Sequence, residues 1–212
     1  MDAFFEARLE GYDAHMLRDI VGAGEFYPFT AAQLPVWDRA TVLDLGCGTG
    51  LELEYYFRKN PTARVTGIDL SAGMLNTLQA KFPEKELELI CGSYFDVPLG
   101  SGVYDAAVSV ESLHHFTREE KTALYRKLWS ALKPAGYFVL TDYFALSGED
   151  EAHWQQELRR LKQVQGIMDS TFYHYDTPLT LAHEQEALME AGFQRIEVLA
   201  SWDATCTLKA WK

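Results

Sequence analysis

Three glycines at alternate positions, Gly46, Gly48 and Gly50, stand between an apolar run and a helical pattern in the stretch TVLDLGCGTGLELEYYF. Glycine inside a helix or strand is destabilising by about 0.5–1 kcal/mol relative to alanine, so three such residues need a physical reason. Because glycine has no Cβ, the backbone of this loop can approach a small ligand closely. The amides at the start of the following helix would favour a carboxylate on that ligand. We therefore predict a small-molecule site at this loop.

A carboxylate follows the second predicted strand. The stretch GIDLS places Asp69 about twenty residues after the glycine loop, where an acid can accept both hydroxyls of a ribose. The loop departs from the dinucleotide fingerprint GxGxxG, since Leu51 stands where the third glycine would be. Spacing alone is a weak discriminator between a dinucleotide and another nucleoside ligand. Asp69 could instead cap the next helix, although Ser71 already serves as a cap.

Titratable side chains also follow the fourth and fifth predicted strands. The stretch VESLHHF contains Glu111, His114 and His115, and the fifth strand ends in Asp142 and Tyr143. An acid at the end of an apolar strand is costly without a partner, so Glu111 is expected to hold a cationic group of a ligand. The other four are candidates for substrate contact or catalysis. The alternative for either histidine is a hydrogen bond at the start of the next helix.

Two aromatic-rich segments could complete such a site. An insertion at residues 145–180 contains TFYHYD, whose His174 could belong to a pocket wall or to a packed loop. An N-terminal arm at residues 1–35 carries Tyr12 and Tyr27, which could close over a ligand. Tyr12 could instead belong to the apolar stripe of a helix predicted over residues 3–21, which Gly22 and Gly24 would end before a loop EFYPFT.

Alternating strand and helix patterns must position these residues. Near-continuous apolar runs predict parallel strands, buried on both faces, at 41–45, 64–69, 87–91, 104–110 and 136–143. Helices are predicted after Ser71 and after Thr117, where Glu120 gives capping-box spacing, and KPAG at 133–136 ends the second helix. This alternation predicts an open α/β sheet with helices on both faces, in a single domain over residues 1–212.

The C-terminal part of the chain predicts further elements. A helix should begin after Ser147, with its buried side marked by Trp154, Leu158, Leu161 and Val164. Another helix, HEQEALMEAG, should end at Gly192. The last two strands, QRIEVLAS and ATCTLKAW, are joined by too few residues for a parallel crossover, so they are predicted to pair antiparallel.

Composition excludes several function classes. The net charge of −12 disfavours nucleic acid as the main partner. The three cysteines form no CxxC pair, so neither a disulfide framework nor a metal site is expected. We expect a reducing, cytoplasmic location instead. We see neither a signal-peptide pattern in MDAFFEARLEGYDAH nor an apolar run long enough for a membrane span. The oligomeric state is left open.

The motifs VLDLGCGTG, GIDLS, YDAAVSVESLHHF and LKPAGYFVLTDY, in this order, resemble those of class I S-adenosylmethionine-dependent methyltransferases. The resemblance covers Thr41 to Tyr143 and extends to the final helix–strand–strand segment. It implies a Rossmann-like sheet of seven strands in the order 3-2-1-4-5-7-6, with strand 7 antiparallel. A dinucleotide-binding enzyme would not predict the terminal hairpin. The implied cofactor is S-adenosylmethionine.

The resemblance also implies which residues hold that cofactor. Its methionine part would be lined by Asp44 and the loop from Gly46 to Gly50, with Cys47 contributing backbone rather than thiol. Asp69 would meet the ribose and Tyr12 the carboxylate, and Leu70 is a further cofactor candidate. Glu111 would hold the ammonium group or a cationic substrate. Met74 would pack on the adenine or serve only the helix core. Where the family often has an acid the chain has Ser93, so adenine would depend on backbone amides and on Tyr94 or Phe95.

Three functions remain open from the sequence. The first is in-line methyl transfer to a nitrogen, oxygen or sulfur atom of a small molecule, for which no single residue has to act as a base. The second is binding of the cofactor or a metabolite without turnover. The third is methylation of a nucleic acid or a protein, disfavoured by the acidic charge and by the absence of an NPPY-type motif after the fourth strand.

Overall fold

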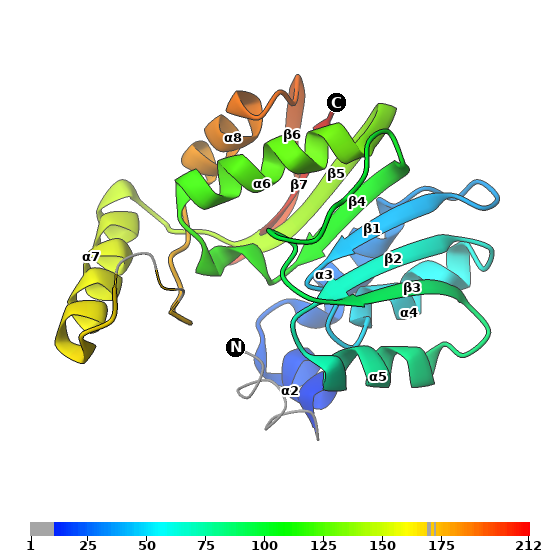
Figure 1. The fold of residues 1–212 in the computed structure, drawn as a ribbon, viewed down its shortest axis with the longest axis horizontal. Coiled ribbons are helices and arrows are strands. Elements are labelled where there is room, and N and C mark those ends of the chain that lie inside the picture. The colour runs from blue at the N-terminus through cyan, green and yellow to red at the C-terminus, as the bar shows by residue number, and fades with distance from the viewer. Residues whose placement is uncertain (1–10, 169–170, 172) are drawn as a thin grey trace.

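Seven strands form one sheet in the computed structural model, which describes residues 11–168, 171 and 173–212 (Figure 1). The strands are β1 (Thr41–Leu45), β2 (Arg64–Asp69), β3 (Glu86–Cys91), β4 (Tyr104–Val110), β5 (Leu132–Tyr143), β6 (Arg195–Trp202) and β7 (Thr205–Trp211). Their order is β3-β2-β1-β4-β5-β7-β6, and β7 runs antiparallel to both of its neighbours while the other pairs are parallel. The predicted fold, terminal hairpin included, is confirmed.

Helices cover both faces of this sheet. They are α2 (Tyr12–Asp19), α3 (Ala23–Ala32), α4 (Leu51–Lys59), α5 (Ala72–Lys81), α6 (Arg118–Ala131), α7 (Gly148–Gln165) and α8 (Leu181–Glu190), with a short 3₁₀ turn at Leu113–His115. Side chains of α6 and α8 share one apolar cluster with one face of the sheet. Side chains of α3, α4 and α5 share a second cluster with the other face. The carboxyl ends of β1, β2, β4 and β5 therefore meet at one edge between two packed layers.

The predicted helix starts are confirmed by their hydrogen bonds. Ser71 accepts a hydrogen bond from the Met74 amide with its hydroxyl at 3.2 Å. Thr117 and Glu120 form the reciprocal capping box at the start of α6. Ser147 caps α7 in the same manner. Each cap satisfies amides that have no partner within the helix, which fixes where the helix begins.

The N-terminal arm differs from its prediction. Residues 3–10 of the predicted helix lie outside the described residues, and α2 begins only after Gly11, whose φ is +86°. The predicted loop EFYPFT is wrong, because it belongs to α3, which contains Gly24 and Pro28. Phe26 in this helix is buried against the sheet. Tertiary packing of the apolar side chains therefore outweighs two poor helix formers.

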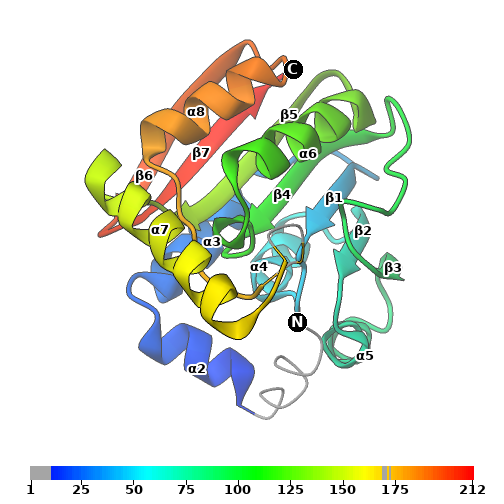
Figure 2. The same cartoon turned by 60° about the vertical axis from the view of Figure 1, so that its left-hand side comes forward.

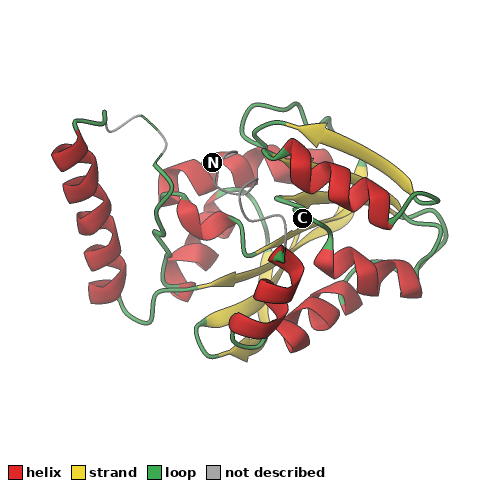
Figure 3. Ribbon diagram, turned by 90° about the horizontal axis from the view of Figure 1, so that it is seen from below, coloured by secondary structure: helices red, strands yellow, loops and turns green. Residues whose placement is uncertain are grey.

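Three further details depart from the predictions. Strand β3 is an edge strand with alternating exposure rather than one buried on both faces. Strand β5 begins at Leu132 and includes the KPAG stretch, where Ala135 has a φ of +64°. The predicted buried side of α7 is wrong, because Val164 is 72% exposed and Trp154, Leu158 and Leu161 are only half-buried. Helix α7 lies away from the sheet (Figure 3), so its apolar stripe has no sheet surface to cover.

Candidate active site

Two of the three loop glycines are required by close packing. Gly46 has a φ of +73°, and a Cβ there would lie 2.1 Å from the Ser112 hydroxyl oxygen. Gly50 has a φ of +74°, and its Cβ would lie 2.2 Å from a methyl carbon of Leu78. The amide of Gly46 donates to the Ile68 carbonyl at 2.8 Å, which ties the loop to the end of β2. These two positions shape the loop itself.

The middle glycine faces open space. Gly48 has a φ of +48°, and a Cβ there would meet nothing within 4 Å. Its amide donates to one carboxylate oxygen of Asp69 at 2.9 Å, and the other oxygen accepts from the Ser71 amide at 2.8 Å. Asp69 therefore joins the glycine loop to the start of α5. Since Ser71 caps α5 with its own hydroxyl, helix capping is not a sufficient reason for a carboxylate at Asp69.

Two adjoining cavities lie at this edge of the sheet. The smaller one, the loop cavity, has a volume of about 70 Å³ and is lined by Tyr12, Gly46, Gly48, Asp69, Leu70, Met74, Tyr94, Val110, Glu111, Ser112 and His115. The larger one, the wide cavity, has about 750 Å³ and is lined by Gly11, Tyr12, His15, Met16, Ile20, Val21, Glu111, His114, His115, Tyr143, His174, Asp176, Trp202, Asp203, Ala204 and Thr205. Tyr12, Glu111 and His115 belong to both walls, so the two cavities meet at these residues.

The structure thus brings together eight of the predicted cofactor residues and separates others. Those outside both walls are Asp44, Cys47, Gly50, Ser93 and Phe95. Asp44 is 1% exposed and faces the buried Glu52. Burial first, and then the charge of Glu52, raise the pKa of Asp44 well above its usual range. A proton shared between these two carboxyls is the arrangement that burial favours.

The remaining cofactor candidates outside the walls serve local packing. The Cys47 thiol packs on Gly67, where a Cβ would lie 2.8 Å from the sulfur. The Ser93 hydroxyl accepts from the Phe95 amide at 3.2 Å. The Phe95 ring packs against Phe116 with centroids 4.7 Å apart. Tyr27 from the arm is buried in the core beside Phe26 rather than on a cavity wall.

Glu111 stands in an unusual backbone conformation at the meeting point of the cavities. Its φ is +49°, a left-handed conformation that few residues other than glycine adopt and that costs about 1–3 kcal/mol. The Thr205 hydroxyl donates to its carboxylate at 3.2 Å, and its amide donates to the Thr141 carbonyl at 2.8 Å. Burial and the nearby Asp142 raise the pKa of Glu111 to about 7. The strain and the raised pKa both mark a residue held for function.

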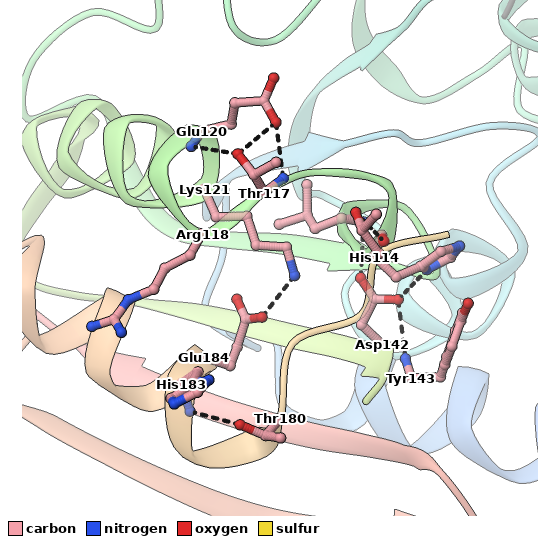
Figure 4. Close-up of polar contacts among 12 residues, drawn as sticks. His114, Thr117, Arg118, Glu120, Lys121, Asp142, Tyr143, Thr180, His183 and Glu184 are labelled. Atoms are coloured by element: carbon pink, nitrogen blue, oxygen red, sulfur yellow. Dashed lines mark hydrogen bonds and ion pairs between the residues drawn. The ribbon is translucent and has the colours of Figure 1, made fainter. Parts of the chain in front are cut away.

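Asp142 lies behind the wide cavity and holds His114 in place (Figure 4). One carboxylate oxygen lies 2.5 Å from Nδ1 of His114 and also accepts from the Tyr143 amide at 3.0 Å. The other oxygen accepts from the Leu113 amide at 2.8 Å. Burial alone would raise the pKa of Asp142 and lower the pKa of His114. The contact between the two outweighs burial, so the pKa of Asp142 is lowered and that of His114 is raised. The predicted Asp142 is therefore a partner of His114 rather than a wall residue.

A second carboxylate faces both histidines from the other side. Asp176 lies 2.9 Å from Nδ1 of His115 and 3.8 Å from Nε2 of His114. The His174 ring packs on His115, with centroids 4.4 Å apart, and Tyr143 packs on His114 at 4.5 Å. Burial, and then the neighbouring His114, lower the pKa of His115 to about 4. The predicted residues of the two strand ends and of the insertion thus form one polar wall.

Several wall residues were missed by sequence reasoning. Asp176 follows His174 by two positions, and a carboxylate beside a histidine is the signal that could have identified it. Ser112 follows Glu111, and its hydroxyl opposes Gly46. His15 and Thr205 come from α2 and from the start of β7, and no motif relates them to the strand ends. Residue 172 of the TFYHYD stretch lies outside the described residues.

Comparison with known proteins agrees with this fold. Residues 42–136 match the family described as "Methyltransferase domain". A carboxy-S-adenosyl-L-methionine synthase from Wolinella succinogenes is 31% identical over 204 residues, which cover 87% of this chain and 80% of that relative. The chain therefore belongs to the class I S-adenosylmethionine-dependent methyltransferase family, whose cofactor is S-adenosylmethionine.

Two further similarities are more limited. A fatty-acid O-methyltransferase from Mycolicibacterium smegmatis is 32% identical over 134 residues, 63% of this chain and 47% of that relative. This chain matches only 33–47% of the length of three curated relatives that are 32% identical to it. The solved human N-acetylserotonin methyltransferase, in complex with S-adenosylmethionine, superposes with a TM-score of 0.65 at 18% identity, over 99% of this chain and 55% of that one. At this identity, the similarity to the human enzyme shows a shared fold and nothing about the substrate.

Among the helices of the described residues, none combines the length and the apolar character that crossing a bilayer demands.

Proposed function

We propose that this chain transfers a methyl group from S-adenosylmethionine to a nitrogen, oxygen or sulfur atom of a small molecule bound in the wide cavity. One observation carries the proposal: the loop cavity and the wide cavity meet at Glu111 and His115, directly beside the glycine loop and Asp69. A nucleoside in the first cavity would present its reactive end to the second. Membership of the methyltransferase family supports the same reaction.

The loop cavity fits the cofactor by its chemistry, and because its volume of about 70 Å³ is smaller than a whole nucleoside needs, its walls would have to separate on binding. Asp69 offers carboxylate oxygens on the wall to which the ribose hydroxyls can donate. Gly48 leaves the space that a side chain would fill, so the methionine part can lie against bare backbone. Met74 and Tyr94 provide apolar wall for an adenine. Asp44, Cys47, Gly50, Ser93 and Phe95 would then act through the backbone or through packing.

The side chains of the wide cavity would position the acceptor. When bound, the cofactor supplies an electrophilic methyl group, and most of the reactivity belongs to it. Alignment of two reacting groups can contribute about 7–11 kcal/mol, so orientation by the polar wall is the main task of the protein. His114, held by Asp142, can accept a proton from the acceptor where one must leave. Glu111, with a pKa raised to about 7, could instead remain neutral and donate.

The dimensions of the site support a small acceptor. A volume of about 750 Å³ lies within the range of about 300–1,000 Å³ typical of small-molecule sites. The arm at residues 1–35 contributes Tyr12 and His15, and the insertion at 145–180 contributes His174 and Asp176, so both segments would cover the acceptor. In Figure 2, α2 and α7 flank the same side of the molecule. The charge of −12 and these acidic walls argue against a nucleic acid.

We also propose a cytoplasmic location. All three cysteines are unpaired, and Cys91 is exposed. An exposed thiol is typical of a reducing compartment.

The test separates the three functions that the sequence left open. Binding of S-adenosylmethionine and of its demethylated product would be measured by calorimetry, and we expect one molecule per chain. The protein would then be incubated with methyl-labelled cofactor and, in separate arms, with a metabolite fraction, with RNA and with protein. Label in the metabolite fraction alone supports the proposal. Label in RNA or protein alone, or binding without transfer in any arm, contradicts it.

A further inference from the structure

Two adjacent histidines and one aspartate converge on the wall of the wide cavity. His114 and His115 form a 3₁₀ turn after β4, and Asp176 comes from the segment after α7. One ligand atom of each residue lies within 4.8 Å of the other two. His115 Nδ1 lies 2.9 Å from an oxygen of Asp176, and His114 Nε2 lies 3.8 Å from the same oxygen. Three donors of this kind at this spacing are a candidate metal set.

His114 has a carboxylate partner, Asp142, on the ring nitrogen that would not bind the metal, as metal-binding histidines commonly do. Asp142 is 1% exposed and lies 2.5 Å from Nδ1, so the proton of the neutral ring belongs on that nitrogen. Nε2 then carries the lone pair, and it lies 3.8 Å from Asp176. A carboxylate behind a histidine fixes the ring and increases its basicity as a ligand. The backbone amides of Leu113 and Tyr143 in turn hold Asp142.

We propose that His114, His115 and Asp176 bind one divalent first-row transition metal ion, with Zn²⁺ as the reference ion. Two imidazoles and one carboxylate are the ligands of three-ligand zinc sites that keep an open position. Ligands at about 2.0–2.2 Å from one tetrahedral ion are about 3.4 Å apart, so separations of up to 4.8 Å need changes of about 1.4 Å or less. No cysteine takes part, which is why the cysteine spacing gave no sign of the site.

The open position would face the wide cavity. An ion there would bind an oxygen donor of the acceptor, such as a hydroxyl or a carboxylate, close to the place where the two cavities meet. With the ion bound, Nε2 of His114 is a ligand and does not act as the base. A bound hydroxyl instead loses its proton to solvent more readily because the ion stabilises the negative oxygen. The site would therefore select acceptors that carry a chelating oxygen. Metal binding itself does not depend on the proposed methyl transfer.

The test is direct measurement of metal on the untagged full chain. Protein stripped with a chelator would be dialysed against Zn²⁺, and bound zinc counted by elemental analysis. Co²⁺ would be titrated in parallel, because its visible absorption reports coordination by protein ligands. We expect one ion per chain, and at least a tenfold weaker affinity for both Asp176→Asn and His115→Gln. Asp142→Asn should weaken the affinity about 10–100-fold.

A matched control exists elsewhere in the chain. His183 lies 2.8 Å from Glu151, a single histidine–carboxylate pair outside the proposed set. His183→Gln should leave the stoichiometry and affinity unchanged. Zinc bound equally by wild type and by both Asp176→Asn and His115→Gln, or no zinc bound by wild type at micromolar concentrations, would overturn the proposal. Cofactor binding in the same wild-type samples, measured without metal, separates a failure of this site from a failure of the proposed reaction.

Discussion

The two cavities at the edge of the sheet are built in different ways. The loop cavity takes most of its wall from residues that end or directly follow β1, β2 and β4, among them Gly48, Asp69 and Glu111. The wide cavity takes its wall from the arm, from the insertion after β5 and from the β6–β7 turn as well as from the strand ends. A sheet that fixes its own strand ends also fixes the first cavity. The second depends on how separate segments pack around it.

Because the two walls are built differently, the shape of the wide cavity can vary more than the shape of the loop cavity. Parallel strand ends leave little freedom in the loop cavity, as the close approach of Gly46 to Ser112 shows. Of the segments around the wide cavity, α7 lies at the outside of the molecule (Figure 1). A family with one cofactor and many acceptors would be expected to place the cofactor in the first and the acceptor in the second.

The largest effect should follow removal of the carboxylate from the loop cavity. In Asp69→Ala, the affinity for S-adenosylmethionine should fall about 10²–10⁴-fold, because two hydrogen bonds to a charged acceptor are worth about 1.5–3 kcal/mol each. Calorimetry measures the loss, and thermal unfolding shows whether the chain still folds. Asp38→Ala, at an exposed loop position, is the control and should bind as wild type. A folded Asp69→Ala that binds within tenfold of wild type would remove Asp69 from the site.

Next in size is the contrast between two neighbouring glycines. Gly46→Ala should lower the free energy of unfolding by about 2–4 kcal/mol, because its Cβ would collide with Ser112 in a left-handed conformation. Gly48→Ala should cost only about 1 kcal/mol but weaken cofactor binding about tenfold, because its Cβ enters the loop cavity. Urea unfolding and calorimetry measure the two quantities.

The glycine contrast has its own control. Adding Ser112→Gly to Gly46→Ala removes the colliding hydroxyl and should restore part of the lost stability. Equal stability losses at the two glycines, or no recovery in the double variant, would mean that the loop is shaped by something other than this contact.

A smaller effect concerns the residue shared by both cavities. The pKa of Glu111 is raised from 4.5 to about 7, so the folded state binds its proton more tightly than the unfolded state. The contribution to stability is therefore present below pH 4.5 and is lost as the pH rises through 7. At pH 8, Glu111→Gln should be more stable than wild type by about 1–3 kcal/mol, with little difference near pH 4.5. Urea unfolding at the two pH values measures it, and an equal difference at both would contradict the assigned pKa.

The smallest effect should come from the outer wall of the insertion. Trp154 in α7 packs on Tyr175 with ring centroids 5.9 Å apart, away from the loop cavity. Trp154→Ala should therefore leave the affinity for S-adenosylmethionine within about twofold of wild type, since the removed contact touches no wall of that cavity. Calorimetry would check this, and a tenfold loss would show that the two cavities are coupled through α7.

The sequence predicted the sheet and the loop cavity for the same physical reason. Apolar runs and caps are local signals, and the glycine loop and Asp69 follow directly from strands that those signals identify. Helix α3 was missed because Gly24 and Pro28 are locally unfavourable, whereas the burial of Phe26 that stabilises it is not visible in the local pattern. Local patterns are reliable where neighbours in sequence are also neighbours in space.

The wide cavity could be predicted only in part. The two histidines were found because they follow a predicted strand and Tyr143 because it ends one, but Asp176 meets them from an insertion whose packing no periodicity specifies. Glu111 was identified from its charge, whereas its left-handed conformation became evident only in three dimensions. The apolar stripe of α7 predicted a buried face, but that helix covers no sheet and leaves Val164 exposed.

The most direct test of the division between the two cavities is a crystal structure with S-adenosylhomocysteine. The ribose hydroxyls should donate to Asp69, the amino-acid part should lie against Gly48, and the sulfur should face Glu111 and His115 where the cavities meet. A nucleoside bound with its ribose away from Asp69, or with its sulfur directed out of the wide cavity, would contradict the account.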